Sequence, residues 1–266
     1  MPTDEEELAI AEEKFRQFLI LADEILRLRQ TTNERLQVAL QAGTIQKSLR
    51  NRVLIGLSLK ALDSFERLLV DACDRRAECS HHLKTMAESF IYTGWVSEDT
   101  GDTRARLLCA EGYRSRAVYH EEIGETEYAK QWRDLHSQEI KDLEIEWKTF
   151  KNTKLDKLSV EAKRDEQYHH VYRIACEAAH MGDLMVYMPP QPTEGGLRFS
   201  DLSFLRAYVC LKFGIILACD LLHDASNALK MGLDQQINSF RERWRAIIAL
   251  NGISGAQSEG GNTKGV

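Results

Sequence analysis

Residues that could act together on a phosphate ester gather in one stretch of the chain, YHHVYRIACEAAHMGD (168–183). Histidine titrates near neutral pH and can move protons, and the arginine guanidinium holds phosphate oxygens through two parallel hydrogen bonds. Arg173 and His180 are seven residues apart. On an α-helix this spacing places both side chains on one face, about 10 Å apart, with Glu177 between them. Cleavage of RNA without a metal needs such a proton-moving group and a fixed cation at the scissile phosphate.

The same residues also fit an ordinary structural helix. Arg173 and Glu177 have the spacing of an i,i+4 ion pair, which stabilises a helix by roughly 0.2–0.5 kcal/mol. His180 comes just before Gly182, where we expect the helix to end, and the helix dipole would stabilise an imidazolium there. The sequence therefore leaves two interpretations open, a catalytic pair and the polar stripe of a structural helix.

Carboxylate–histidine pairs suggest a third kind of chemistry, because the spacing E-x-x-H is typical of di-iron helical bundles. The pairs with this spacing are Glu78 with His81, Glu177 with His180, and Asp220 with His223. A di-iron site needs one further glutamate from each of two other helices, and the sequence singles out neither. We therefore predict no metal ligands and no cofactor.

The element type follows from the scarcity of helix breakers. The 266 residues include four prolines, and three of them lie in one segment, Pro189, Pro190 and Pro192. This leaves room for long helices, and no segment alternates between polar and apolar residues as a half-buried strand would. The sequence also lacks an internal repeat and a glycine-rich phosphate loop. It predicts an all-α protein built as a multi-helix bundle.

Apolar residues at helical spacing predict where the helices lie. The expected helices are residues 5–42, 50–73, 75–97, two within 104–150 broken near Gly124, one that starts at Ser159 and holds the opening stretch, one from Asp201 or Ser203 to Leu222, and 233–250. Asp102 or Thr103 is the predicted N-cap of the first helix within 104–150.

These elements form one predicted domain, residues 1–250, with its core in residues 50–97 and 159–225. The apolar stripe of residues 104–150 is narrow, so we expect a long charged helical hairpin on the outside of the bundle. The tail, residues 251–266, is rich in glycine and serine and is predicted to be disordered.

Charge and composition restrict the partners and the compartment. The net charge of −6 excludes an overall basic field, so contact with RNA would use local patches. One such patch is RERWR (241–245), which a solvated amphipathic helix explains equally well. The N-terminus lacks the features of a signal peptide, and the most apolar segment, 204–222, carries three charged residues. We expect a cytoplasmic protein without a membrane span, whose six cysteines are small buried hydrophobes in a reducing compartment.

Two segments, ALDSFERLLVDACDRRAECSHHLKTMAESFIYTGWV (61–96) and YHHVYRIACEAAH (168–180), resemble an uncharacterised bacterial family of all-helical proteins. The resemblance extends over roughly residues 50–225. The family pattern has a basic residue and then a glutamate on one helix, and Tyr-Arg, Ser or Cys, and His on a later helix. The matching positions here are Lys84, Glu88, Tyr172, Arg173, Cys176 and His180.

The Arg-x6-His helix also resembles the HEPN superfamily, whose members are helical bundles that often dimerise and act as metal-independent ribonucleases in toxin and defence systems. This resemblance implies a HEPN-like bundle and a homodimer that cleaves or binds RNA. It gives Arg173 the role of holding the phosphate and His180 the role of moving the proton. Glu177 would orient one or both, and Tyr172 and Glu88 would support the site. The chain departs from the superfamily at Ile174, where a polar residue usually follows the arginine.

A different class of function stays open beside the ribonuclease. A non-catalytic helical adaptor or regulatory protein would use the same bundle to bind a partner protein, for example one encoded in the same operon. The RERWR segment and the charged helices within 104–150 are the candidate surfaces for such a partner.

Overall fold

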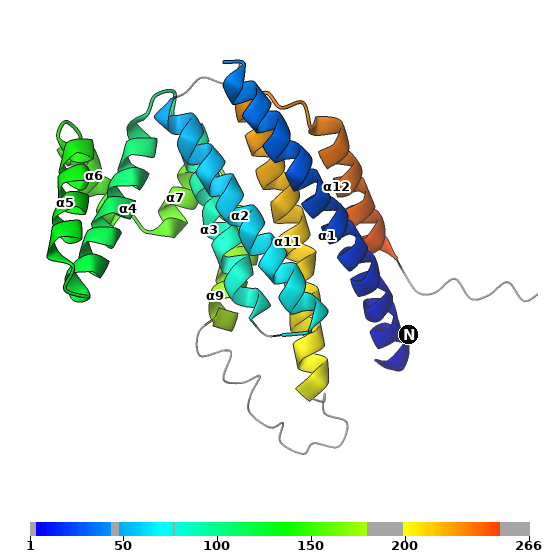
Figure 1. Ribbon diagram of the computed structural model, residues 1–266. Coiled ribbons are helices and arrows are strands. Elements are labelled where there is room, and N and C mark those ends of the chain that lie inside the picture. The colour runs from blue at the N-terminus through cyan, green and yellow to red at the C-terminus, as the bar shows by residue number, and fades with distance from the viewer. Residues whose placement is uncertain (1–3, 44–47, 77, 180–198, 251–266) are drawn as a thin grey trace, which may run out of the picture.

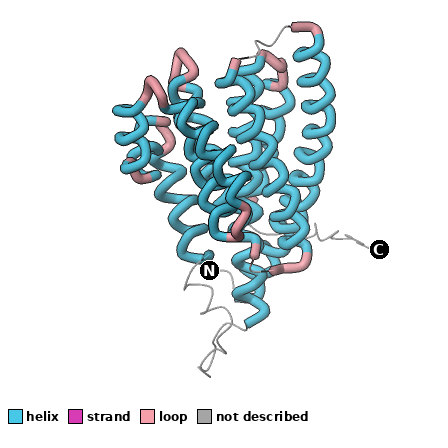
Figure 2. Tube along the Cα trace, turned by 60° about the vertical axis from the view of Figure 1, so that its left-hand side comes forward, coloured by secondary structure: helices cyan, strands magenta, loops and turns pink. Residues whose placement is uncertain are grey.

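The computed structural model describes residues 4–43, 48–76, 78–179 and 199–250. These residues form helices joined by loops and turns, with no strand among them (Figure 2). The predicted all-α class is therefore confirmed. None of the helices in these ranges is long and apolar enough to cross a membrane. The predicted disordered tail, residues 251–266, lies outside the described residues.

The long helices make up the bundle and are α1 (Asp4–Gln41), α2 (Leu49–Cys73), α3 (Cys79–Ser97), α11 (Phe199–Leu229) and α12 (Asp234–Ala249). The elements between α3 and α11 are α4 (Thr103–Glu122), α5 (Thr126–Ile140), α6 (Glu144–Asn152), α7 (Leu155–Glu161), α8 (Asp165–Gln167), the π-helical turn η1 (Tyr168–Tyr172) and α9 (Arg173–Ala179).

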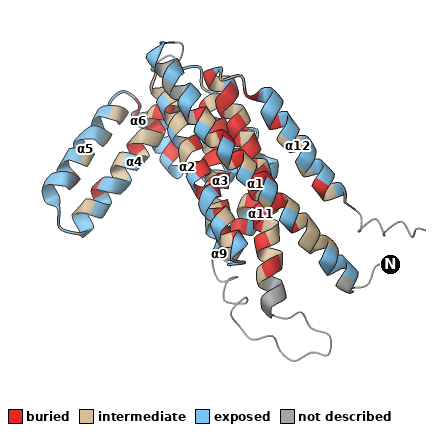
Figure 3. Ribbon diagram, turned by 45° about the vertical axis from the view of Figure 1, so that its right-hand side comes forward, coloured by how far each residue is buried: buried red, intermediate tan, exposed pale blue. Residues whose placement is uncertain are grey.

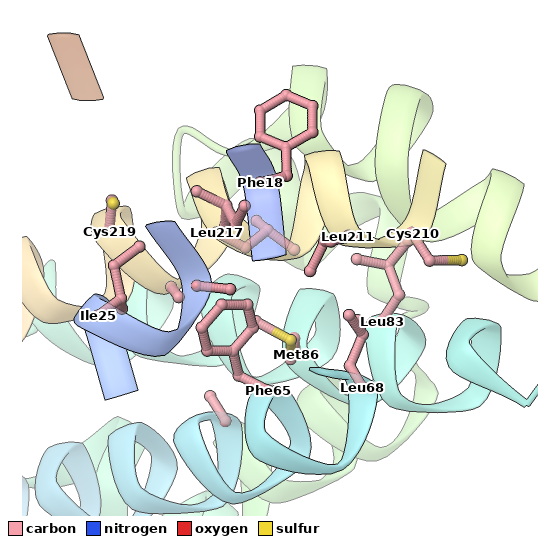
Figure 4. Close-up of a cluster of buried hydrophobic side chains, with 14 of the residues drawn as sticks. Phe18, Ile25, Phe65, Leu68, Leu83, Met86, Cys210, Leu211, Leu217 and Cys219 are labelled. Atoms are coloured by element: carbon pink, nitrogen blue, oxygen red, sulfur yellow. The ribbon is translucent and has the colours of Figure 1, made fainter. Parts of the chain in front are cut away.

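The main core lies where α2, α3 and α11 pack together, and α1 and α12 pack on α11 and on each other (Figure 1). Its side chains include Phe18 of α1, Phe65 of α2, Met86 of α3 and Leu211 of α11 (Figure 4). Burying one such side chain contributes roughly 1.5–3 kcal/mol relative to leaving it exposed. This core fixes α3, the helix that carries part of the candidate site.

Gly94 allows α3 to approach the segment that leads to the candidate site. A Cβ atom at Gly94 would lie 3.1 Å from the carbonyl oxygen of Ala162 and 3.2 Å from Cγ of Arg164. Any larger residue would push α3 away from the C-terminal end of α7. The absence of a side chain at this position therefore sets the distance between the two segments.

The helices α4 and α5 form a hairpin that stands away from the bundle (Figure 1). The prediction of one helix from the glycine to residue 150 is wrong, because α5 ends at Ile140 and α6 begins at Glu144. The turn between them brings Trp147 and Phe150 back to the bundle, where Phe150 stacks on Trp95 of α3 with ring centroids 5.1 Å apart. A continuous helix would carry both aromatic side chains away from α3.

The N-cap predicted at Asp102 is wrong in its detail. Asp102 precedes α4, but its side chain makes no cap hydrogen bond there. Its carboxylate instead accepts the backbone N–H of Arg50, in the first turn of α2, at 2.8 Å. The first turn of α4 is stabilised by Asp99, whose carboxylate accepts the backbone N–H of Arg104 at 2.8 Å. The sequence shows several acidic residues in this loop but not which helix each one faces.

Two further predicted helix starts are corrected. Ser159 lies inside α7, where it is buried and its hydroxyl donates to the carbonyl of Asp156 at 2.6 Å. The helix predicted to run from Asp201 or Ser203 to Leu222 extends over Phe199–Leu229, so both of these polar residues lie within α11. The predicted helix from Ser159 through the opening stretch is wrong, because α7 ends at Glu161 and the described part of that stretch belongs to η1 and α9. Helical periodicity located α11 but did not fix its ends.

The cysteine prediction holds for half of the residues. Cys79, Cys210 and Cys219 are buried, whereas Cys73 is exposed and Cys109 and Cys176 are partly exposed. Cys73 is the last residue of α2, where the helix end reaches solvent. Burial raises the pKa of the Cys219 thiol to about 12, so this thiol behaves as an unreactive hydrophobe.

Candidate functional site

Three of the residues that the sequence singled out, Glu88, Tyr172 and Arg173, lie where α3 packs beside η1 and α9 (Figure 1). The hydroxyl of Tyr172 is hydrogen-bonded to the side chains of Glu88, on α3, and Cys176, on α9. A carboxylate only accepts hydrogen bonds, so the phenol donates to Glu88. We call Glu88, Tyr172 and Cys176 the Tyr172 cluster. The sequence predicted that Glu88 and Tyr172 support one site, and the fold brings them together across 84 residues of chain (172 − 88).

The environment of Tyr172 keeps its hydroxyl protonated. Burial raises the pKa of Tyr172, and the neighbouring Cys176 and Glu88 raise it further. The negative charge of Glu88 would repel a phenolate and stabilises the neutral phenol as its hydrogen-bond donor. Tyr172 is therefore suited to hold α9 against α3 and not to act as a base. Lys84, one turn before Glu88 on α3, is half-buried.

A π-helical turn precedes the candidate arginine. The backbone N–H of Arg173 donates to the carbonyl of Tyr168, five residues earlier. Such a turn inserts one extra residue into a helix and is frequent at functional sites. It places the ring of Tyr168 against that of Tyr172, with centroids 5.2 Å apart and planes at 24°. The sequence predicted an uninterrupted helix here and carries no pattern that would reveal the π-turn.

The first turn of α9 has a buried and an exposed side. Val171 and Ala175 are buried, whereas Arg173 and Ile174 are exposed. Among the side chains that the structure describes, no carboxylate pairs with Arg173. Ile174 is 42% exposed, so the position at which the chain departs from the HEPN pattern lies at the surface and not in the core.

His180, the second residue of the predicted catalytic pair, and its neighbour Glu177 are described only in part or not at all. His180 lies outside the described residues. Glu177 is part of α9, but its side chain also lies outside what the structure describes. The shared face of Arg173 and His180, and the Arg173–Glu177 ion pair, stay predictions.

A family model matches residues 51–190, slightly more than half of the chain. The chain belongs to DUF5677, a family of unknown function. The DUF5677 match begins within α2 and extends beyond α9, so it includes the whole Tyr172 cluster, Arg173 and His180. This confirms the predicted membership of a family without an assigned function. No curated protein and no solved structure matches the chain.

Within the DUF5677 match, Arg164 anchors the segment that leads into the π-turn. Its guanidinium contacts both carboxylate oxygens of Asp224, on α11, at 2.9 and 3.2 Å, and lies 4.5 Å from the ring centre of Phe90. Burial raises the pKa of Asp224, although the charge of Arg164 opposes that shift. The pair lines a cavity of about 340 Å³ that Arg50 and Lys163 also border. The sequence does not predict this contact, because no local pattern joins residues 60 positions apart.

The described E-x-x-H pairs offer no preformed metal site. Within the described ranges, no group of three or more His, Cys, Asp or Glu side chains could hold a metal ion. Glu78 and His81 are both exposed. Asp220 is paired with Arg241 at 2.6 Å, and His223 Nδ1 lies 3.3 Å from Asp234. The structure describes neither the side chain of Glu177 nor that of His180, so it says nothing of a metal site at this third pair.

The RERWR segment is occupied by contacts within the chain. Arg241 pairs with Asp220, and Arg243 pairs with Glu24 of α1. The indole N–H of Trp244 donates to the carbonyl of Lys212 at 2.9 Å. Most of this segment therefore joins α12 to α1 and α11, which favours its interpretation as an amphipathic structural helix.

Proposed function

We propose that this protein binds RNA and cleaves it without a metal ion, with Arg173 and His180 as the catalytic pair. The proposal takes the HEPN-like function that the Arg-x6-His spacing predicts, including its toxin or defence context and its homodimer. That likeness rests on this spacing and on the all-α fold. The membership of DUF5677 neither adds an activity nor opposes one.

One observation carries the proposal, namely the exposure of Arg173 directly after a π-turn whose last residue is fixed to α3. Tyr172 donates to Glu88, and the adjacent Arg173 projects towards solvent. An arginine that is needed only for helix stability requires neither the π-turn nor the hydrogen-bonded hydroxyl beside it. An arginine that must meet a phosphate needs a helix held at a fixed distance from its neighbour.

The reaction would use the 2′-hydroxyl of the RNA as its nucleophile. His180 would take the proton of this hydroxyl, and the oxygen would attack the neighbouring phosphorus. Arg173 would hold the phosphate oxygens and stabilise the additional negative charge of the transition state. His180 would pass this proton on to the 5′-oxygen of the next nucleotide as the P–O5′ bond breaks, so the products would end in 2′,3′-cyclic phosphate and 5′-hydroxyl groups. Glu177 would orient the pair, and the Tyr172 cluster would position α9.

The surface beside Arg173 contains further groups suited to RNA. His169 and His170 are exposed, and Lys84 lies on the facing helix. These groups form a local set of donors in a chain whose net charge of −6 repels phosphate elsewhere. We therefore expect weak RNA binding that falls steeply with salt concentration.

The test compares Arg173→Ala, His180→Ala and the double variant in single-turnover cleavage of an end-labelled RNA. We expect each single variant to slow cleavage by at least about 100-fold and the double variant to be little worse than either, because residues that act as a unit are non-additive. The matched control is Arg27→Ala, which removes an exposed arginine of α1 and should leave cleavage unchanged.

Thermal unfolding of the same variants separates catalysis from structure. The proposal requires nearly equal melting temperatures, since Arg173 is exposed. If His180→Ala instead lowers stability while the wild-type protein leaves RNA intact, the pair is structural. That result would favour the non-catalytic adaptor.

A further inference from the structure

The α4–α5 hairpin exposes an unusual amount of apolar surface at its tip. The large side chains concerned are Val118 (43% exposed), Tyr119 (57%), Ile123 (50%) and Tyr128 (56%). They lie within 11 residues of chain (118 to 128), around the turn between the two helices. Figure 3 shows the hairpin standing away from the bundle with mostly exposed residues. Clusters of exposed apolar side chains mark interaction surfaces more often than chance.

Ring contacts connect Tyr119, His120 and Tyr128 within this surface. The ring of His120 lies 5.3 Å from that of Tyr119 and 5.6 Å from that of Tyr128. Further along the hairpin, Trp132 stacks on Tyr113 with ring centroids 5.6 Å apart. The guanidinium of Arg116 lies 4.6 Å from the centre of the Trp132 ring. Tyrosine, tryptophan and arginine dominate the binding energy of protein interfaces, and rings that are already held in place lose little entropy on binding.

Most of the tip side chains lie outside the packing of the hairpin, although Tyr128 of α5 contacts His120 of α4. The buried residue of α5 is Ala129, and the buried residue in the second half of α4 is Ala117. Small alanines let the two helices approach closely. The aromatic side chains therefore remain on the outside, which is the arrangement of a surface that meets another molecule.

The charge at the tip selects the partner. Residues 118–128 contain four glutamates and no lysine or arginine. Glu121 pairs with Arg133, and Glu125 contacts His120. Glu122 and Glu127 are exposed and pair with no side chain in the described part of the chain. Such a surface repels the phosphates of RNA and attracts lysine and arginine.

We propose that the tip of the hairpin, residues 118–128, docks a basic amphipathic segment of another protein. The apolar side chains of that segment would pack on Tyr119, Ile123 and Tyr128, and its lysines or arginines would pair with Glu122 and Glu127. An amphipathic helix presents both kinds of side chain at the required spacing. This inference is independent of the proposed ribonuclease activity.

A second copy of this chain fits the surface less well. A symmetric contact between two tips would bring the glutamates of both copies together, which is unfavourable. Of the arginines of α4, Arg106 pairs with Glu139 and Asp142, and Arg114 pairs with Glu111. Arg116 lies over the ring of Trp132, further along the hairpin. The charge at the tip thus favours a different, basic protein.

The test selects helical peptides from a displayed random library with the full-length protein as bait. The selected peptides should combine apolar residues with an excess of lysine and arginine. Their affinity should fall by at least about tenfold for Tyr119→Ser/Tyr128→Ser and for Glu122→Lys/Glu127→Lys, as expected for residues at the centre of an interface. A matched control is Ile145→Ser/Glu146→Lys on α6, which alters another exposed apolar residue, 79% exposed, beside a glutamate. This control should leave the affinity unchanged.

Any of four outcomes would overturn the proposal. The selection could yield no binding peptides, or peptides without a basic excess. Peptides with a basic excess could bind both tip variants as tightly as the wild-type protein. Sedimentation could show a dimer that Tyr128→Ser dissociates, which would assign the tip to a second copy of the chain. Melting curves of all variants confirm that the hairpin stays folded in each comparison.

Discussion

The Tyr172 cluster and the tip of the α4–α5 hairpin both place aromatic and polar side chains near the surface, but their supports differ. Tyr172 is hydrogen-bonded to α3, a helix whose Leu83, Met86 and Phe90 are buried in the main core. The tip residues lie at the end of α4, in the turn and at the start of α5, and the buried residue of α5 is Ala129. The first region is held by the bundle, and the second is held mainly by its own hairpin partner.

This difference indicates which kind of function each region suits. Groups that must meet a reacting phosphate need positions fixed to within about 0.5 Å, which a packed helix pair provides. A docking surface tolerates movement, because its affinity depends on the area and charge that it offers. Changes in the bundle should therefore affect stability and site together, and changes at the tip should affect binding alone.

The largest effect is expected from Phe65→Ala in the bundle. Phe65 is fully buried among α2, α3 and α11 (Figure 4), and removal of a buried phenyl ring lowers the free energy of unfolding by about 3–5 kcal/mol. Urea denaturation measures the change. Leu135→Ala on α5, 38% exposed, is the control and should cost well under half as much. Equal losses would show that the hairpin is as tightly packed as the bundle.

A smaller loss is expected where α3 meets the segment before the π-turn. Gly94→Ala places a Cβ 3.1 Å from the carbonyl of Ala162 and should destabilise the protein by about 1–3 kcal/mol. Gly112→Ala in the middle of α4 is the matched control, since a Cβ there meets nothing within 4 Å. That change should stabilise the protein by about 0.5–1 kcal/mol. A shift of the denaturation midpoint in the same direction for both substitutions would contradict the close approach of α3 to Ala162 as the reason for Gly94.

Tyr172→Phe removes the hydroxyl that joins α9 to α3. It leaves Glu88 and Cys176 without this partner and should lower the free energy of unfolding by about 0.5–1.5 kcal/mol. The sign of its pH dependence follows from the raised pKa of Tyr172. Stability from this group is fully present below the pKa of an unfolded tyrosine, about 10, and is lost as pH rises above that value towards the raised pKa of the folded state.

Stability measured from pH 7 to 11 checks this dependence. The difference between the wild-type protein and Tyr172→Phe should be constant up to about pH 10 and shrink above it, because only the wild-type chain loses the phenol proton on unfolding. Tyr128→Phe, at the exposed tip, is the control and should show no such change. A constant difference across the whole range would mean that the hydroxyl of Tyr172 is not held as described.

The smallest effect on stability is expected at the tip. Val118→Ser and Tyr128→Ser replace exposed side chains, and surface changes of this kind usually alter the free energy of unfolding by no more than about 0.5 kcal/mol. A loss above about 2 kcal/mol in the free energy of unfolding is what truncation of a buried side chain costs. Such a loss would mean that these residues serve the packing of the hairpin and not a partner.

The fold class could be predicted from the sequence, because helical periodicity and the scarcity of proline depend only on local residues. Helix ends were harder to predict. Asp99 and Asp102 are both plausible caps for α4, and only the packing of α2 against this loop decides that Asp102 faces Arg50. The break at residues 141–143 likewise depends on where Phe150 packs against Trp95 and Trp147.

The candidate site was partly predictable for the same reason. The pairing of Glu88 with Tyr172 followed from a resemblance in pattern, and the fold places the two residues in contact. The π-turn and the Arg164–Asp224 pair depend on contacts between distant segments and leave no mark in the local sequence. Residues that act across helices are therefore found from the sequence only when a family pattern connects them.

The most direct test of the proposed activity is the chemistry of the RNA ends. The wild-type protein, treated with EDTA, is incubated with an end-labelled RNA oligonucleotide and with the same oligonucleotide carrying 2′-deoxy sugars throughout. We predict that the RNA is cut to fragments ending in 2′,3′-cyclic phosphate, that the deoxy substrate stays intact, and that His180→Ala cuts neither. Intact RNA with the wild-type protein, or cleavage by His180→Ala at the wild-type rate, would contradict the account, as would fragments ending in 3′-hydroxyl groups.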